Sequence, residues 1–134
     1  MSRRRDKHKR AASRDDDADI GRVRTLLERL HALLTRIGNA RAASIDALSA
    51  RFAADPAGAW REIDGNGWWA GAGSIAADSM ADNPGIADSQ WQAEICEFRE
   101  LLIEIGEILR ARGDTNPGLS SWLLAFRNWL DSGV

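Results

Sequence analysis

One segment of the chain carries five glutamates whose spacing would bring their charges together. They are Glu94, Glu97, Glu100, Glu104 and Glu107. At about 100° per residue they fall on one side of a helix, which makes an acidic ridge. Carboxylates without histidine are a poor ligand set for zinc, so we expect no metal here. Such a ridge is either the solvated face of a helix or a surface that attracts a basic partner, and the sequence leaves both open.

Groups that could act as a catalytic base or nucleophile are scarce and isolated. His8 lies in a charged segment, His31 has no second histidine near it in the sequence, and Cys96 stands between two of the glutamates. Acid–base and nucleophilic catalysis need such a group held beside an orienting partner. We therefore predict that the protein is not an enzyme and binds no cofactor.

Two tryptophans precede a run of small residues in the stretch NGWWAGAGSIAADS, residues 66–79. A phosphate-binding loop would need GxxxxGK[ST] or GxGxxG between a strand and a helix, and this stretch fits neither pattern. We expect instead a Gly-rich joint between helices at residues 65–74. Burial of both rings in the core is the interpretation that we favour. Adjacent side chains point in different directions, however, so the alternative is that either Trp68 or Trp69 is exposed as an anchor for a partner.

Two long amphipathic helices should position these residues. The first spans about 17–37, and its apolar residues recur every three or four positions, at Ile20, Val23, Leu27, Leu30, Leu34 and Ile37. Another face of it carries an arginine every seven residues, at Arg22, Arg29 and Arg36. The second spans about 89–112 and holds a narrow apolar seam of Trp91, Ile95, Phe98, Leu102, Ile105 and Leu109. This periodicity is typical of helices packed on a core.

Shorter helices are predicted between and after these two. Residues 41–54 form one, and Asp55-Pro56 starts another that runs through Ile63, because Asp caps a helix and Pro suits its first position. A third spans Ser74–Met80 and ends at Asn83-Pro84-Gly85, while the last follows Asn116-Pro117. We predict an all-α fold, a compact bundle of about five or six helices. Its length suits one domain.

The charge of the chain is divided unevenly along its length. Residues 1–14 contain seven Lys or Arg and one Asp, a formal charge of +6, whereas the remaining residues carry 11 basic and 19 acidic side chains. Without Leu, Ile, Val or aromatic residues the first segment cannot bury enough apolar surface to fold alone. We predict a disordered basic tail at residues 1–16 and a single helical domain at 17–134. Residues 3–14 could contact nucleic acid through its phosphates.

The sequence also allows a prediction of the cellular compartment and of membrane association. No apolar run approaches the roughly 20 residues of a membrane-spanning helix, and no secretory signal is evident. One cysteine allows no intramolecular disulfide. We expect a cytoplasmic protein that does not associate with a membrane.

The joint resembles a segment of a small bacterial family, a domain of unknown function, that reads Trp-Trp-Gly-x-x-Gly-Ser-Ile and is followed by Asp. The residues that carry the resemblance are Trp68, Trp69, Gly71, Gly73, Ser74 and Ile75. Ala70 stands in place of the first glycine, and Asp78 comes one residue later than the Asp of the family. That family is similar to immunity proteins encoded beside bacterial toxins. The resemblance implies a protein that neutralises a toxin domain, with Trp68, Trp69 and Asp78 in contact with it.

Two hypotheses of different classes follow. In the first, the protein is an immunity-type inhibitor whose acidic ridge and aromatic anchor occlude a basic protein partner. In the second, it is a nucleic-acid-associated or regulatory protein that binds through its basic N-terminal arm. Homodimerisation through the apolar seam of residues 91–109 is also left open.

Overall fold

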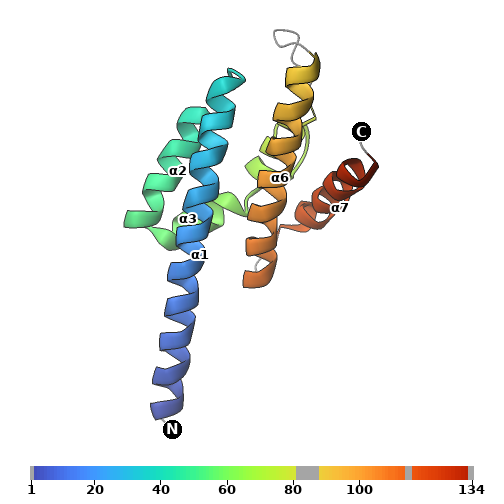
Figure 1. Cartoon of the computed structure of the whole chain (residues 1–134). Helices are drawn as coiled ribbons and strands as arrows, with labels where there is room; N and C mark the ends of the chain where they lie inside the picture. The colour runs from blue at the N-terminus through green and yellow to red at the C-terminus, as the bar shows by residue number, and fades with distance from the viewer. Residues whose placement is uncertain (1, 81–87, 114–115, 133–134) are drawn as a thin grey trace.

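The chain folds into helices throughout the residues that its computed structural model describes, which are 2–80, 88–113 and 116–132 (Figure 1). The helices are α1 (Ser2–Arg36), α2 (Ala42–Ala54), α3 (Pro56–Ile63), α4 (Asn66–Trp69), α5 (Ile75–Asp78), α6 (Asp88–Arg112) and α7 (Pro117–Ser132). Five of these have eight residues or more, and α4 and α5 are single turns. The predicted all-α bundle is therefore confirmed. Helix α4 lies within the predicted Gly-rich joint of residues 65–74, and α5 directly follows it.

The long helices lie side by side in the order α2, α1, α6, α7 (Figure 1). Neighbours in this row pack on one another, and α1 and α6 run in opposite directions. The short helices also connect α2 with α7, the two outer helices of this row. Helix α3 packs on α2, α4 packs on α3, and α4 also contacts α7. The joint is thereby enclosed by elements from both halves of the chain.

The core forms where the apolar stripe of α1 meets the apolar seam of α6. Most of both predicted sets is buried, and the fully buried members include Leu27, Leu30, Leu34, Phe98, Leu102 and Ile105. Ile20, Ile37 and Trp91, at the ends of the two sets, are partly buried. Removal of these side chains from water is the main force that holds the two helices together. The seam of α6 is thus covered within the chain, which leaves little apolar surface there for a second copy.

Most helix ends follow the local signals. Asp55 caps α3, since its Oδ1 accepts a hydrogen bond from the Gly58 backbone N–H at 3.1 Å. That bond, with a second from Arg51, holds the pKa of Asp55 below its usual value. Gly38 and Gly113 end α1 and α6 with φ of +70° and +88°, a conformation that favours glycine. The predicted stop at 83–85 lies outside the described residues.

Helix α1 begins at Ser2, well before the start near residue 17 that the periodicity predicted. Residues 2–16 contain neither glycine nor proline, and Arg, Lys and Ala are good helix formers. Nothing in this local sequence therefore interrupts the helix, which projects beyond the end of the bundle in Figure 1. That residues 1–16 are disordered in the free protein stays a prediction.

The closest backbone approach in the joint is made by Gly118 of α7. A Cβ atom at this position would overlap the carbonyl oxygen of Trp69. The Gly118 N–H donates to Oδ1 of Asn116 at 2.9 Å, which fixes the first turn of α7 against the joint. Gly71 and Gly73, inside the predicted joint, both have open space where a Cβ would lie. Only Gly71 needs a positive φ, of +77°.

We predict that Gly118→Ala lowers the free energy of unfolding by about 1–3 kcal/mol, because the added methyl group forces α7 away from Trp69. Urea denaturation followed by circular dichroism measures the change. The control is Gly21→Ala in the interior of α1, where no atom lies within 4 Å of the added Cβ. That substitution should raise stability by about 0.5–1 kcal/mol. A Gly118→Ala protein as stable as the parent would contradict this packing.

Candidate functional site

The N-terminal end of the acidic ridge, Glu94 and Glu97, forms ion pairs with α1. Arg36 donates from Nε and Nη2 to the two carboxylate oxygens of Glu94, at 3.2 and 2.9 Å, and its Nη2 also reaches Glu97 at 2.8 Å. The bond to Glu94 is the main reason why the pKa of Arg36 is raised above its usual value. Glu94 is the less exposed of the two carboxylates. These glutamates therefore hold α6 to α1.

The pairing follows the antiparallel register of the two helices. Arg29 and Arg36 are seven residues apart on α1, as are Glu97 and Glu104 on α6. Arg36 contacts Glu97, and one repeat further along Arg29 lies 3.9 Å from Glu104. Both partners of the second contact are about half exposed, so it is the weaker one. The matching seven-residue spacing in the sequence was the signal for this contact.

The C-terminal end of the ridge, Glu107, contacts α7. Glu107 forms an ion pair with Arg127 of α7 and lies 3.9 Å from Arg110 on its own helix. Arg99, the cation within the ridge sequence, is on another side of α6, where it is buried and stacks 4.6 Å from the centroid of the Trp129 ring. Burial lowers the pKa of Arg99. Arginines from both neighbouring helices thus meet the two ends of the ridge.

The middle of the ridge is its open part. Glu100 is exposed, and within the described residues it forms no ion pair or hydrogen bond. Glu104 is also exposed and holds only the long contact to Arg29. Ala93 and Cys96 lie next to them on the outer side of α6 and are exposed as well. We call Ala93, Cys96, Glu100 and Glu104 the outer strip of α6.

Both tryptophans of the joint are buried, which is the favoured of the two predicted alternatives, and the alternative of one exposed ring is wrong. Trp69 is fully buried, and its Nε1–H donates to the carbonyl oxygen of Ile63 at 2.8 Å. Trp68 is 4% exposed and lines a hollow together with Leu48 and Ile75. The centroids of the two rings lie 6.0 Å apart, and α4, which carries both residues, packs on α3, α5 and α7. Neither ring is available as a surface anchor in this structure.

Asp78 fastens the joint to the loop that follows α1. Its Oδ2 accepts hydrogen bonds from Arg41 Nε at 2.7 Å and from Asn39 Nδ2 at 3.2 Å. Arg41 also donates to the carbonyl oxygen of Gly73. Asp78 is therefore engaged within the chain, with partners in the loop after α1 and not on the ridge. These contacts between distant segments had no signal in the sequence.

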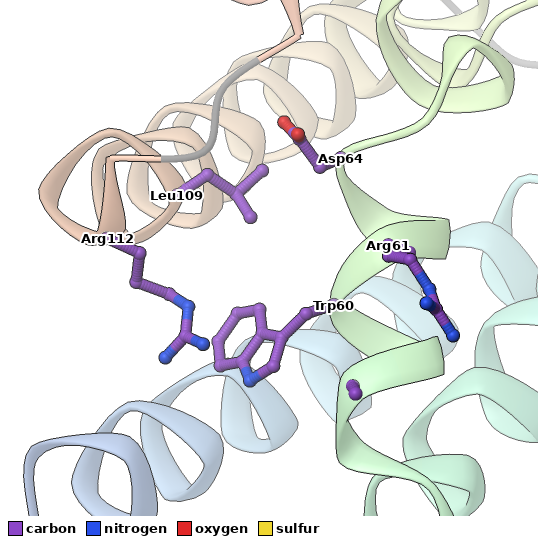
Figure 2. Close-up of a pocket in the computed structure, with 6 residues that line it drawn as sticks. Trp60, Arg61, Asp64, Leu109 and Arg112 are labelled. Carbon is purple, nitrogen blue, oxygen red and sulfur yellow. The ribbon is translucent and has the colours of Figure 1, made fainter. Parts of the chain in front are cut away.

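Sequence reasoning missed a hollow centred on Trp60, between α3 and the end of α6 (Figure 2). The guanidinium carbon of Arg112 lies 3.9 Å from the centroid of the Trp60 ring. Arg112 Nη1 in turn contacts Asp16 at 2.5 Å and Asp19 at 3.6 Å, both on α1. The hollow has a volume of about 330 Å³ and is lined by Ala57, Trp60, Arg61, Asp64, Leu109 and Arg112. We call it the Trp60 hollow.

Two kinds of feature are absent from the part of the chain that the structure describes. Three or more His, Cys, Asp or Glu side chains placed to share a metal ion do not occur there. No described helix combines the length and the apolar composition needed to cross a bilayer. Comparison with known protein families, with curated proteins and with solved structures gave no match to this chain. The function is therefore argued from the two surfaces described above.

We predict that Trp69→Phe costs more stability than Trp68→Phe. Both changes remove part of a buried ring, but only the first also leaves the carbonyl oxygen of Ile63 without its indole donor. An unsatisfied buried acceptor adds about 1–3 kcal/mol to the loss in the free energy of unfolding. Urea denaturation of the two variants gives the comparison. Equal losses, or a larger loss for Trp68→Phe, would contradict the role assigned to the Trp69 N–H.

Proposed function

We propose that this protein is a protein-binding inhibitor of the immunity type, which occludes a basic partner such as the catalytic domain of a bacterial toxin. The observation that carries the proposal is the outer strip of α6, where Glu100 and Glu104 are exposed in the middle of the ridge. The resemblance of residues 68–75 to an immunity-related family supports the same class of function. No catalytic role is part of the proposal.

The outer strip combines negative charge with easy access. Cys96 and Ala93 are small, so a partner can approach the helix closely beside Glu100 and Glu104. The neighbouring glutamates are held by arginines of α1 and α7, which keeps their side chains from closing over the strip. Exposed charge of one sign chiefly raises the rate of association with a partner of opposite charge. The acidic excess of residues 15–134 acts in the same direction.

Burial of the joint changes how the proposed inhibitor would make contact. Trp68 and Trp69 are both buried, so in the proposal they contribute to binding only by holding the fold. Asp78 is likewise committed to Arg41 and Asn39. In the proposal the direct contacts therefore come from α6, with Glu100 and Glu104 at their centre and Glu94, Glu97 and Glu107 at the edges.

The second candidate function is nucleic-acid binding through the N-terminal arm. One observation favours it: the backbone of α1 continues to Ser2 and projects past the bundle (Figure 1). A projecting helix that includes the seven basic residues of positions 1–14 could lie along a phosphate backbone without hindrance from the acidic body.

The inhibitor proposal predicts that Glu100→Lys combined with Glu104→Lys slows association with the partner by roughly tenfold and leaves the fold intact. The partner is first isolated by retention on the tagged full-length chain and release by salt, and rates are then measured by surface plasmon resonance. The control reverses Asp17 and Asp46, which are exposed on α1 and α2. An unchanged association rate in the first variant, or equal slowing in the control, would remove the outer strip from the function.

The arm hypothesis predicts that deletion of residues 1–14 abolishes binding to a short DNA or RNA duplex. Binding by the full chain should weaken steeply with salt, with a slope of about −0.9 in log K against log salt for each phosphate contacted on DNA. Fluorescence anisotropy at several salt concentrations measures both quantities. If the truncated chain binds as tightly as the full chain, or neither binds, the arm has no such role.

A further inference from the structure

The Trp60 hollow contains an arginine whose orientation is fixed before any ligand arrives. Arg112 lies over the Trp60 ring, and its Nη1 is held by Asp16 and Asp19. Stacking on an aromatic ring and ion pairing from one side restrict a guanidinium that would otherwise be mobile. Figure 2 shows Arg112 extending from α6 to the ring, with Leu109 and Asp64 on the same rim.

One edge of this guanidinium is still available. Both carboxylate contacts use Nη1, and in the described part of the chain Nε and Nη2 have no hydrogen-bond partner. Those two nitrogens form the edge that binds a carboxylate through two parallel hydrogen bonds. An arginine that is already ordered loses less conformational freedom when it makes such a pair.

The other polar groups of the hollow also favour a ligand that accepts hydrogen bonds. Trp60 is 8% exposed, and its buried Nε1–H lacks a hydrogen-bond partner among the described residues. Arg61, whose side chain runs away from Arg112 along the rim, can only donate (Figure 2). The single carboxylate of the lining, Asp64, already accepts from the Asn116 backbone N–H at 2.7 Å.

The rest of the lining is apolar and suits the body of a small molecule. Leu109, Ala57 and the Trp60 ring all line it, and Arg112 already covers part of that ring. A volume of about 330 Å³ is at the lower end of the range for small-molecule sites. Size and lining together fit an anion with one ring or a short alkyl chain.

We propose that the Trp60 hollow binds a small organic carboxylate with an apolar body, whose carboxylate pairs with the free edge of Arg112. Asp16 and Asp19 have a double role in this site. They orient Arg112 through Nη1, and their negative charge keeps the affinity for an anion modest. The site lies at the junction of α1, α3 and α6 and is independent of the outer strip of α6.

Sodium benzoate is the probe, and benzyl alcohol is its neutral counterpart of the same shape. In ¹H–¹⁵N spectra of the full chain, benzoate should shift the Trp60 indole cross-peak, assigned with Trp60→Phe, and the Arg112 Nε–H cross-peak in a saturable way. Benzyl alcohol should bind roughly tenfold more weakly or less, because it cannot form the paired hydrogen bonds. The indole cross-peaks of the other five tryptophans are internal controls.

Variants test which groups hold the anion. Arg112→Lys keeps the positive charge but loses the two-nitrogen edge, so the dissociation constant for benzoate should rise roughly tenfold. Asp16→Asn removes a negative charge that repels the bound anion, so the dissociation constant for benzoate should fall severalfold. A site for a cation would show the opposite change. Arg24→Gln, on an exposed part of α1, should change nothing.

Three results would overturn the proposal. One is the absence of any shift at the Trp60 indole up to about 20 mM benzoate, where even a very weak site would be half filled. Another is equal binding of benzyl alcohol and benzoate. The third is a folded Arg112→Lys or Asp16→Asn protein whose affinity for benzoate changes in the opposite direction or not at all.

Discussion

The antiparallel packing of α1 on α6 is the constraint on which the rest of this structure depends. Leu27, Leu30 and Leu34 of α1 meet Phe98, Leu102 and Ile105 of α6 in a fully buried layer. Removing this apolar surface from water fixes both the distance and the register of the two helices. Helix α2 then packs on the other side of α1 and α7 on the other side of α6, so all the long helices take their places from this contact.

The same packing decides which charges remain available to a partner. With the helices in this register, Arg36 meets Glu94 and Glu97, while Arg112 meets Asp16 and Asp19 at the other end. Charges along the contact are thus largely balanced within the chain, and the surplus lies on the outer strip of α6. Exposed ion pairs of this kind add little stability, and their main effect here is on the distribution of surface charge.

Much of the architecture could be predicted from local patterns. The stripe of α1, the seam of α6, the Asp55-Pro56 start of α3 and the glycine ends of α1 and α6 all depend on residues near one another in the sequence. The joint shows the limit of such patterns. Its position was predicted, but the burial of both Trp68 and Trp69 also depends on α7, which reaches the joint from a distant part of the chain.

The sequence by itself determined that the chain is helical, where most of its helices end, and that five glutamates share one side of α6. Only the tertiary structure decided which of those glutamates stay exposed, because their arginine partners are on α1 and α7. It also created the Trp60 hollow, whose residues come from α3 and α6 and whose arginine is oriented from α1. Helical periodicity reports the face on which a side chain lies, whereas its neighbours across that face depend on how the helices pack.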